Sequence, residues 1–296
     1  MLIILCYNNH RNEVRRVSGS SGFVKFLYTN AIGRTFLKVI IKLRLDRAVV
    51  RFLRSSASKI IIGRYAKKNG IALTKDERKS FGSFRDFFAR TRTGTPVDNE
   101  PSHLVSPCDG WLSAFKISDD ACFDIKNSHY RVSDFICDAS LAKNYENGDL
   151  LIFRLCANDY HHYSYIDGGY QGENHYIEGE LHSVQPIVCE SVPIYVKNRR
   201  SWCILKTDNF GSTVQCEIGA LVVGGIVNHS NGGRFEKGSE KGHFDLSGST
   251  IVLMLEPGKI KLNADILEAL SYNEEVRVTE GQFIGVSNDN ITEERK

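Results

Sequence analysis

Several absences narrow what this chain of 296 residues can be. Its eight cysteines include no pair at the C-x-x-C spacing, so no zinc or other metal site is expected. In a chain long enough to bury a sizeable core, such scattered cysteines are typical of reduced thiols in a cytosolic setting. No run of about eighteen uncharged apolar residues occurs, so no transmembrane helix is expected. The apolar start at residues 1–7 lacks a basic segment and is too short for a signal peptide.

Charge is distributed unevenly along the chain. Residues 11–70 hold fifteen Lys or Arg against two acids, a local balance of +13. Because the whole chain carries +3 and residues 1–10 contain no Lys, Arg, Asp or Glu, residues 71–296 must carry −10. A basic N-terminal region is therefore followed by an acidic body.

The basic region has the pattern of helices. Within residues 31–43, basic side chains recur every four positions at Arg34, Lys38 and Lys42, which places them on one helix face. A second such segment spans residues 47–54. Two interpretations stay open: helices packed on the body with a solvated basic face, or helices lying on an anionic membrane. Nucleic acid is not an expected partner, because no recognition motif accompanies the charge.

From residue 100 onward the pattern changes to short β-type segments separated by Gly-Gly, Asn-Gly and Pro-Gly turns. The clearest segments are residues 150–155, 212–218, 221–223 and 251–255. We find no internal repeat and no low-complexity linker. The sequence therefore predicts an α+β protein with a helical, basic, membrane-associating region at residues 1–75 and a β-rich body at residues 76–296.

The tripeptide Gly248-Ser249-Thr250 directly precedes the apolar run of residues 251–255. A Gly-Ser bond at the mouth of a buried strand can be a self-cleavage site, because the Ser hydroxyl can attack the preceding carbonyl and convert the amide into an ester. Elimination then leaves a pyruvoyl group at the new chain end. Glycine favours this position because it adopts strained backbone geometry at low cost. Taken alone, the tripeptide is also a common loop sequence.

Four further segments carry side chains suited to chemistry, and each also has an ordinary explanation. Core packing explains the aromatic residues 83–90, and close backbone approach explains the small residues of 217–226. Asp109 lies in an Asp-Gly turn before a predicted strand, which turn chemistry accounts for. His161 and His162 are adjacent, so on a strand only one would point into a site. A His is the side chain best suited to move protons near neutral pH, although a simple packed or surface pair is the alternative.

In this order along the chain, the segments resemble the motifs of the phosphatidylserine decarboxylase family. The family's Phe-Phe-x-Arg, Ser-Pro-x-Asp-Gly, Asp-Tyr-His, Ile-Gly-Ala-x-x-Val-Gly and Lys-Gly-x-Glu-x-Gly-x-Phe…Gly-Ser-Thr motifs have counterparts at residues 87–90, 106–110, 159–161, 218–224 and 237–250. The resemblance spans residues 20–286. It is strongest to bacterial members that carry one extra residue between the Phe and the Gly-Ser-Thr.

This resemblance implies a proenzyme that cuts itself between Gly248 and Ser249. The products would be a β chain of residues 1–248 and an α chain of residues 249–296, headed by a pyruvoyl cofactor made from Ser249. The substrate phosphatidylserine would form a Schiff base with the pyruvoyl carbonyl. It would then lose CO2 to give phosphatidylethanolamine.

The resemblance also implies roles and partners. His161 would return a proton to the substrate, and Asp109 would act with a His to prepare Ser249 for attack. The basic helices fit a peripheral enzyme on the cytoplasmic side of the cell membrane, with an anionic phospholipid membrane as partner. The β and α chains would form a heterodimer, and a homodimer is also compatible. The implied fold is a β-rich barrel or sandwich with peripheral helices.

One position departs from the family pattern. Many members read Asp-Tyr-His-x-x-His, and the second His is the usual base of self-cleavage, but this chain has Ser164 there. A hydroxyl cannot accept a proton near neutral pH as an imidazole does. His161 could serve both steps, His162 could be swung inward by a bulge, or His182 could supply the imidazole. We favour His161 or His182, because His162 should face away on a regular strand.

Three functional hypotheses follow. The first is a pyruvoyl-dependent phosphatidylserine decarboxylase. The second is an enzyme of the same machinery that decarboxylates another amino acid. The third is an unprocessed, non-catalytic relative that binds anionic membrane through residues 21–70, a hypothesis that Ser164 keeps open.

Overall fold

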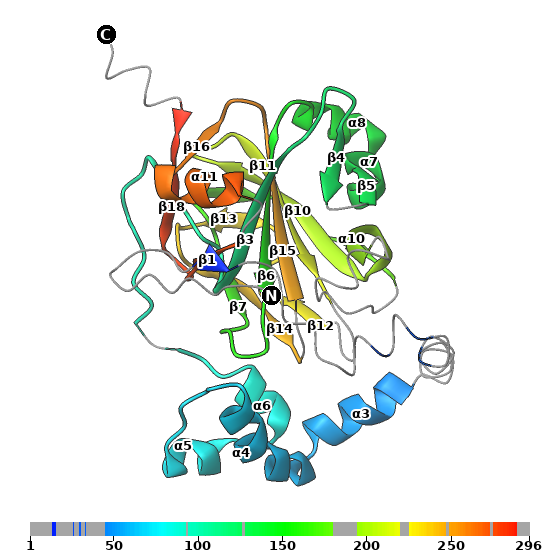
Figure 1. The fold of residues 1–296 in the computed structure, drawn as a ribbon, viewed down its shortest axis with the longest axis vertical. Coiled ribbons are helices and arrows are strands. Elements are labelled where there is room, and N and C mark those ends of the chain that lie inside the picture. Colours follow the sequence, from blue (N-terminus) through cyan, green and yellow to red (C-terminus); the bar gives the residue numbers. More distant parts are fainter. Residues whose placement is uncertain are drawn as a thin grey trace.

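The computed structural model describes residues 14–15, 26, 30, 33, 45–92, 94–125, 128–179, 194–219, 225–246, 249–272 and 275–288. Figure 1 shows a strand-rich body with a group of helices at its lower end. The helices and strands are β1 (Val14–Arg15), α3 (Leu45–Arg54), η1 (Ser56–Ser58), α4 (Lys59–Lys68), α5 (Lys75–Ser80), α6 (Phe84–Phe88), β2 (His103–Val105), β3 (Gly110–Lys116), β4 (Cys122–Ile125), β5 (Ser128–Arg131), α7 (Val132–Ile136), α8 (Ala139–Ala142), η2 (Lys143–Tyr145), β6 (Asp149–Leu155), β7 (His162–Ser164), β8 (Gly169–Gln171), β9 (His175–Ile177), α10 (Ile194–Lys197), β10 (Arg200–Thr207), β11 (Ser212–Ile218), β12 (Gly225–Asn228), β13 (Gly233–Phe235), β14 (Glu240–Asp245), β15 (Ser249–Leu255), β16 (Ile260–Leu262), α11 (Ala264–Ser271), β17 (Glu275–Val278) and β18 (Phe283–Ser287).

A large antiparallel sheet forms the body. Its strands follow the order β1-β17-β3-β6-β15-β11-β10-β8-β13, and β9 also pairs with β10. β15 lies in the middle, between β6 and β11. Every residue of β15 is buried, which explains why its sequence is a continuous apolar run rather than an alternating one. The strand path does not close into a barrel within the part of the chain that is described.

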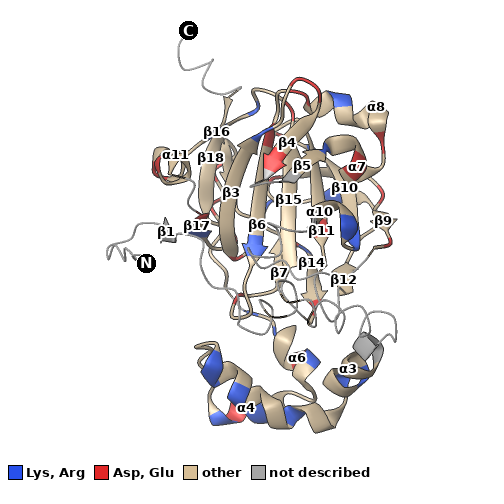
Figure 2. Cartoon of the chain, turned by 45° about the vertical axis from the view of Figure 1, so that its right-hand side comes forward, with Lys and Arg blue, Asp and Glu red and all other residues tan. Residues whose placement is uncertain are grey.

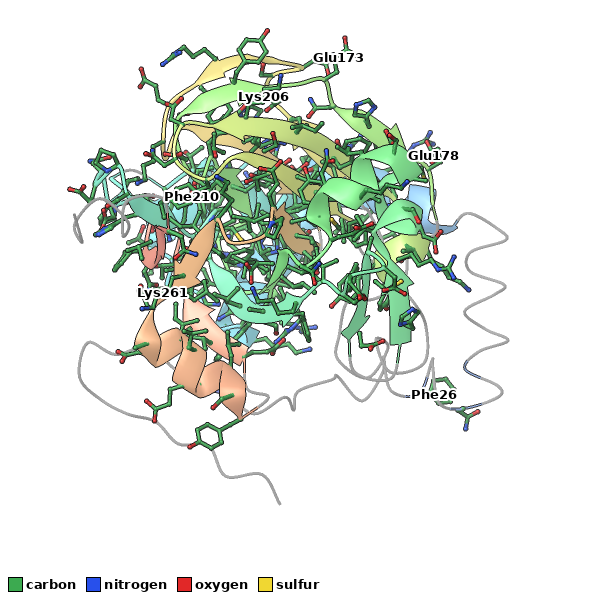
Figure 3. All side chains as sticks on the ribbon, turned by 90° about the horizontal axis from the view of Figure 1, so that it is seen from above. Phe26, Glu173, Glu178, Lys206, Phe210 and Lys261 are labelled. Carbon is green, nitrogen blue, oxygen red and sulfur yellow. The ribbon has the colours of Figure 1, made fainter. Side chains whose placement is uncertain are left out.

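The two faces of this sheet carry separate cores, because successive side chains of a strand point to opposite sides. One core gathers Ile152 and Val252 with the aromatic residues of α7 and its neighbours. The other gathers Phe153 and Ile251 with Tyr163 of β7 and with α11. The small sheet β12-β14-β7 packs on this second face. Figure 3 shows side chains filling the body around buried Phe210, while exposed Lys206, Glu173 and Glu178 lie at its edge.

The helices at the lower end in Figure 1 have their own small core of Ile62, Ala66, Phe84, Phe87, Phe88 and Leu246. Leu246 directly follows β14, so this core joins the helices to the end of that strand. The preceding residue, Asp245, is 2% exposed and accepts hydrogen bonds from Arg54 of α3 (2.9 Å) and from Arg85 of α6 (2.7 Å). Packing and two ion pairs therefore connect the helical region to the end of β14.

The predicted α+β class is confirmed. The segments expected at 150–155, 212–218 and 251–255 are β6, β11 and β15, and the helical segment 47–54 lies within α3. The segment 221–223 and most of the segment 31–43 lie outside the described residues. Among the helices that are described, none is both long and apolar enough to cross a membrane.

Candidate active site

Neighbouring strands of the large sheet bring Ser249 and Asp109 to the same end of the strands. Ser249, the first residue of β15, lies opposite Leu155 at the end of β6. Gly110, the first residue of β3, continues the register of β3 with β6 and lies on the other side of Leu155. Neighbouring strands are about 4.8 Å apart, so Gly110 and Ser249 are separated by about 10 Å. Asp109, the residue before Gly110, therefore lies at the same end of the strands as Ser249.

Ser249 is almost completely buried, with 2% of its surface exposed. It shares a strand face with Ile251, so it faces the second core and the small sheet rather than the first core. Gly248, the other residue of the predicted cleavage site, lies outside the described residues. The structure thus places the predicted nucleophile in a water-poor position at the head of a central strand.

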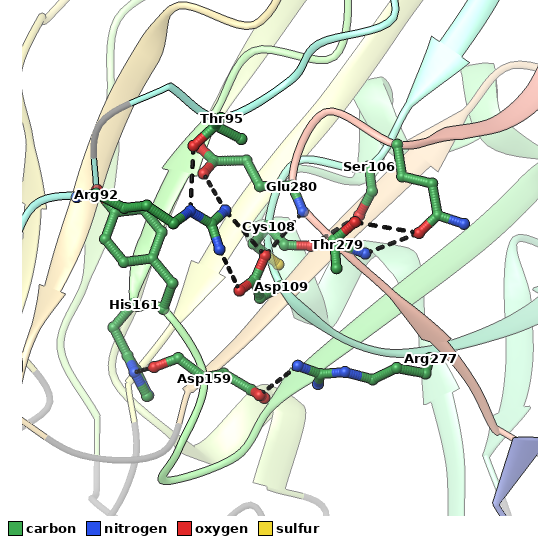
Figure 4. Close-up of polar contacts among 12 residues, drawn as sticks. Arg92, Thr95, Ser106, Cys108, Asp109, Asp159, His161, Arg277, Thr279 and Glu280 are labelled. Atoms are coloured by element: carbon green, nitrogen blue, oxygen red, sulfur yellow. Dashed lines mark hydrogen bonds and ion pairs between the residues drawn. The ribbon is translucent and has the colours of Figure 1, made fainter. Parts of the chain in front are cut away.

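A carboxylate cluster surrounds Asp109 (Figure 4). Arg92 donates to both oxygens of Asp109, at 2.9 and 3.2 Å, and to Glu280 at 3.3 Å. The backbone N–H of Glu280 also donates to Asp109 at 2.9 Å. Burial raises the pKa of Glu280, although Arg92 opposes this shift. An open pocket of about 550 Å³, lined in part by Arg92 and Glu280, gives the cluster access to solvent.

His161 is buried and has a defined tautomer. Its Nδ1 lies 2.9 Å from the carbonyl oxygen of Asp159, and a carbonyl can only accept, so Nδ1 carries the proton. Nε2 is buried and has no hydrogen-bond partner in the part of the chain that is described. Burial lowers the pKa of His161 to about 4. His161 is therefore a neutral imidazole that presents one unprotonated ring nitrogen, Nε2, inside the protein.

Asp159 fixes the position of His161. One oxygen of its carboxylate accepts a 2.6 Å hydrogen bond from Arg277 of β17, and the other accepts from the backbone N–H of Cys156 at 2.6 Å. Figure 4 shows Asp159 lying between His161 and Arg277. On its other side, the ring of His161 contacts Phe88, with 4.3 Å between ring centroids. The imidazole is thus held by a charged pair and by the helical core.

The remaining sequence candidates have different positions. His162 has other partners than His161, since it contacts Glu240 and the carbonyl of Ala89. Ser164 is fully buried, and its hydroxyl donates to the carbonyl of Pro107 at 3.4 Å. The same hydroxyl is near enough to Glu280 to act to lower the pKa of that carboxyl. His182 lies outside the described residues.

Sequence reasoning missed three charged residues of this site: Arg92, Arg277 and Glu280. Arg92 follows the aromatic Phe-Phe-x-Arg motif by two residues, and Glu280 occupies a Glu-Gly turn, but neither pattern has chemical meaning before the chain is folded. Asp109 is brought to Glu280 across 171 residues of sequence. Such pairs become visible only in the tertiary structure.

A buried Ser at a strand head, a guanidinium-bound carboxylate and a neutral buried His are side chains of the kinds that acid–base enzymes use, here in an α+β fold. The chain belongs to the phosphatidylserine decarboxylase family, because the sequence model of that family matches residues 84–286. The family membership inferred from the motifs is thereby confirmed.

Three relatives show how far the similarity extends. The chain is 40% identical to phosphatidylserine decarboxylase proenzyme 2 of Clostridium acetobutylicum, over 91% of this chain and 93% of that protein. It is 35% identical to the phosphatidylserine decarboxylase proenzyme of Clostridium beijerinckii, over 89% and 92%. It is 36% identical to the corresponding proenzyme of Clostridium perfringens, over 92% and 95%. Each alignment thus spans nearly the full length of both proteins.

Proposed function

We propose that the chain is a phosphatidylserine decarboxylase that cuts itself between Gly248 and Ser249 and then converts phosphatidylserine to phosphatidylethanolamine and CO2. One observation supports this most directly: Ser249 is the first residue of a buried central strand, and Asp109 lies at the same end of the neighbouring strands. Family membership and the relatives' names as proenzymes support the same function. The two products, residues 1–248 and 249–296, remain together as a heterodimer.

The cofactor in this proposal is a pyruvoyl group derived from Ser249. The residues present fit it. Ser249 is buried, so a new N-terminus at this position would be shielded from water. Nε2 of His161 is also buried and has no hydrogen-bond partner among the described residues. When present, such a group supplies an electron-accepting carbonyl that makes the loss of CO2 from an amino acid possible. The rest of the chemistry is the work of the chain's own side chains.

His161 moves protons in this proposal. Its Nδ1–H is held by the carbonyl of Asp159, so Nε2 is the atom that accepts and returns a proton. Arg277 holds the Asp159 side chain in place by a 2.6 Å hydrogen bond, and the backbone carbonyl of Asp159 in turn holds the ring. The contact with Phe88 excludes water from one side of the imidazole. His161 can therefore move protons during turnover. It can also be the base of self-cleavage, the role that the family's second His would have at position 164.

Glu280 is a second candidate base for self-cleavage, and its contact with Ser164 supports it. Ser164 occupies the position of the family's second His, and its hydroxyl is near enough to the Glu280 carboxyl to act to lower the pKa of that carboxyl. Glu280 also lies against Asp109 through its backbone N–H and shares Arg92 with it. A carboxyl whose pKa burial raises binds and releases protons more readily near neutral pH than an ordinary one. In this chain, Glu280 and Ser164 together could replace the imidazole.

We further propose that the helical region within residues 1–75 lies on an anionic membrane, at the cytoplasmic side of the cell membrane. Three large apolar side chains of α3 and α4 are exposed: Val49 by 42%, Phe52 by 43% and Ile60 by 78%. Figure 2 shows Lys and Arg concentrated on the same helices. Apolar side chains among basic ones are typical of helices that lie at a membrane surface. The basic side chains with exposed surface are Arg51, Arg54, Arg64, Lys67 and Lys68.

Intact-protein mass spectrometry of the purified chain tests the proposal. We expect two species that correspond to residues 1–248 and 249–296, the smaller without a free amino terminus. Ser249→Ala should stay uncut. Thr213→Val is the matched control, because it removes a buried hydroxyl from the opposite end of the same sheet and should be cut normally.

Two variants separate the candidate bases. If His161 is the base, His161→Gln remains uncut and Glu280→Gln is cut. If Glu280 is the base, Glu280→Gln remains uncut, whereas His161→Gln is cut but releases no CO2. A single full-length species from the unaltered chain would refute the decarboxylase and leave the non-catalytic membrane protein. Cleavage with CO2 release only from a soluble amino acid would identify the second hypothesis as correct.

A further inference from the structure

A second cluster of titratable side chains lies on the small sheet β12-β14-β7, next to the His161 site. His162 of β7 and His243 of β14 are direct cross-strand partners. Glu240 lies three residues before His243 on the same strand. One potential metal-ligand atom of each of these three residues lies within 4.8 Å of the others. His229, just after β12, borders the group, with its Nε2 3.1 Å from His243 Nδ1 and its Nδ1 3.8 Å from Glu240.

The contact between His162 and Glu240 requires a positive charge between them. The Nε2 of His162 lies 3.1 Å from the carbonyl oxygen of Ala89, which can only accept, so Nε2 carries a proton. In a neutral His162, Nδ1 is then a bare lone pair, and it lies 2.5 Å from Oε1 of Glu240. Two acceptors at this distance repel each other. Either an additional proton or a metal ion must neutralise the contact.

We propose that His162, Glu240 and His243 bind a divalent transition-metal ion, for which Zn²⁺ is the best match. Two imidazoles and one carboxylate are a common ligand set of zinc sites that keep an open coordination position. This donor set suits zinc and its neighbours better than Mg²⁺ or Ca²⁺, which prefer oxygen ligands. His162 Nδ1 is the ligand atom on β7, and β14 supplies the other two ligands.

The surroundings of the three ligands have the features that such sites need. A ligating imidazole normally donates its other N–H to a carbonyl or carboxylate, and His162 does so to Ala89. His229 holds the ring of His243 in the same way, as a positioning residue. The side of the cluster that carries Glu240 and His229 is open to solvent, with side-chain exposures of 41% and 42%, so an ion can enter and keep a water ligand.

Metal binding at this position would connect β7 to β14 next to the proposed catalytic His. The backbone N–H of Phe244 donates to the carbonyl of His161 at 2.8 Å. The two ligands His162 and His243 directly follow and precede the two residues of that hydrogen bond. An ion held by both ligands therefore restrains the segment that positions His161, without contacting the His161 ring.

Binding of Co²⁺ to the full-length protein tests this proposal, because tetrahedral Co²⁺ gives a visible absorption spectrum that does not depend on activity. We expect about one Co²⁺ per chain, displaced by Zn²⁺ and removed by a chelator. His243→Gln and Glu240→Gln should each weaken binding by about 100-fold or more. His129→Gln is the matched control, because it breaks a surface His–carboxylate pair with Asp124 (2.8 Å) that belongs to no cluster of three potential ligands among the described residues, and it should bind Co²⁺ unchanged.

Several outcomes would overturn the proposal. Failure of the unaltered protein to retain Co²⁺ or Zn²⁺ after dialysis would show that a proton neutralises the His162–Glu240 contact. Equal Co²⁺ affinity in His243→Gln, Glu240→Gln and the unaltered protein would place the ion elsewhere. Circular dichroism spectra that match the unaltered protein must accompany each variant, and the partly exposed Glu240 makes Glu240→Gln the variant least disruptive to folding. The metal measurement is independent of self-cleavage, so the two proposals can fail separately.

Discussion

Lys241→Met should destabilise the protein strongly, because Lys241 neutralises a buried carboxylate in the sheet. Lys241 is 1% exposed and Glu217 is fully buried, and their Nζ and Oε1 atoms lie 2.9 Å apart. The other oxygen of Glu217 has no hydrogen-bond partner within the described chain. Removing one partner of such a buried pair costs about 3–5 kcal/mol. That is a large part of the about 5–15 kcal/mol that holds a typical domain folded.

The effect of Lys241 is fully present at neutral pH. Burial acts to lower the pKa of Lys241, but the charge of Glu217 and its hydrogen bond outweigh it, and the net pKa is raised above 10.5. For a base with a raised pKa, the stabilisation is complete below the unfolded value and is lost only as the pH rises through the folded value. Unfolding measured near pH 7 therefore reports the whole contribution.

The assay is urea unfolding of Lys241→Met, Glu217→Leu and the double variant, each in the uncut Ser249→Ala background so that a single chain unfolds. The double variant should recover most of the lost stability, because no unpaired charge remains buried. Asn228, which also accepts from Lys241, keeps its hydrogen bond from Tyr163. A loss below about 1 kcal/mol in Lys241→Met, or a double variant no more stable than that single variant, would refute the reasoning.

Three further predictions follow from other contacts. Phe52→Ser with Ile60→Ser should reduce binding to vesicles rich in phosphatidylserine and leave self-cleavage unchanged; equal vesicle binding would argue against the membrane surface. Asp245→Asn removes two ion pairs with partly exposed Arg side chains, worth about 1 kcal/mol each, so trypsin should nick the helical region about 5–30-fold faster, and an unchanged nicking rate would contradict the contact. Gly242→Ala places a methyl group against the carbonyl of β12 and the Tyr163 hydroxyl and should cost about 1–3 kcal/mol in urea unfolding, whereas Gly172→Ala, with ordinary contacts, should not.

The central strands could be predicted from the sequence because each has a local signature. The run after Ser249 is continuously apolar, and β15 is buried along its full length. The prediction that only one of His161 and His162 would point into the site agrees with their different partners: His161 contacts Asp159, and His162 contacts Glu240. Such features depend only on residues that are close in sequence, so they can be recognised before the tertiary structure is known.

The contacts around the site could not be predicted, because they join distant segments. Arg277 meets Asp159 across 118 residues of sequence, and no local pattern signals that pairing. The sequence drew attention to the missing His at Ser164 but could not show that a buried carboxyl, Glu280, would lie against that hydroxyl. Only the register of β17, β3, β6 and β15 makes these positions neighbours.

The central position of β15 has a consequence for the order of events in the life of the molecule. Residues 249–296 supply β15 between β6 and β11, β17 beside β3, and β18 beside β2. In residues 1–248 alone, β6 would pair only with β3 and β11 only with β10, and the sheet would be split in the middle, so folding would have to precede the proposed cleavage. Once cut, the molecule could regain its sheet only by a bimolecular encounter of two incomplete chains. The cut protein would thus no longer refold reversibly, and its lifetime would depend on how slowly it unfolds.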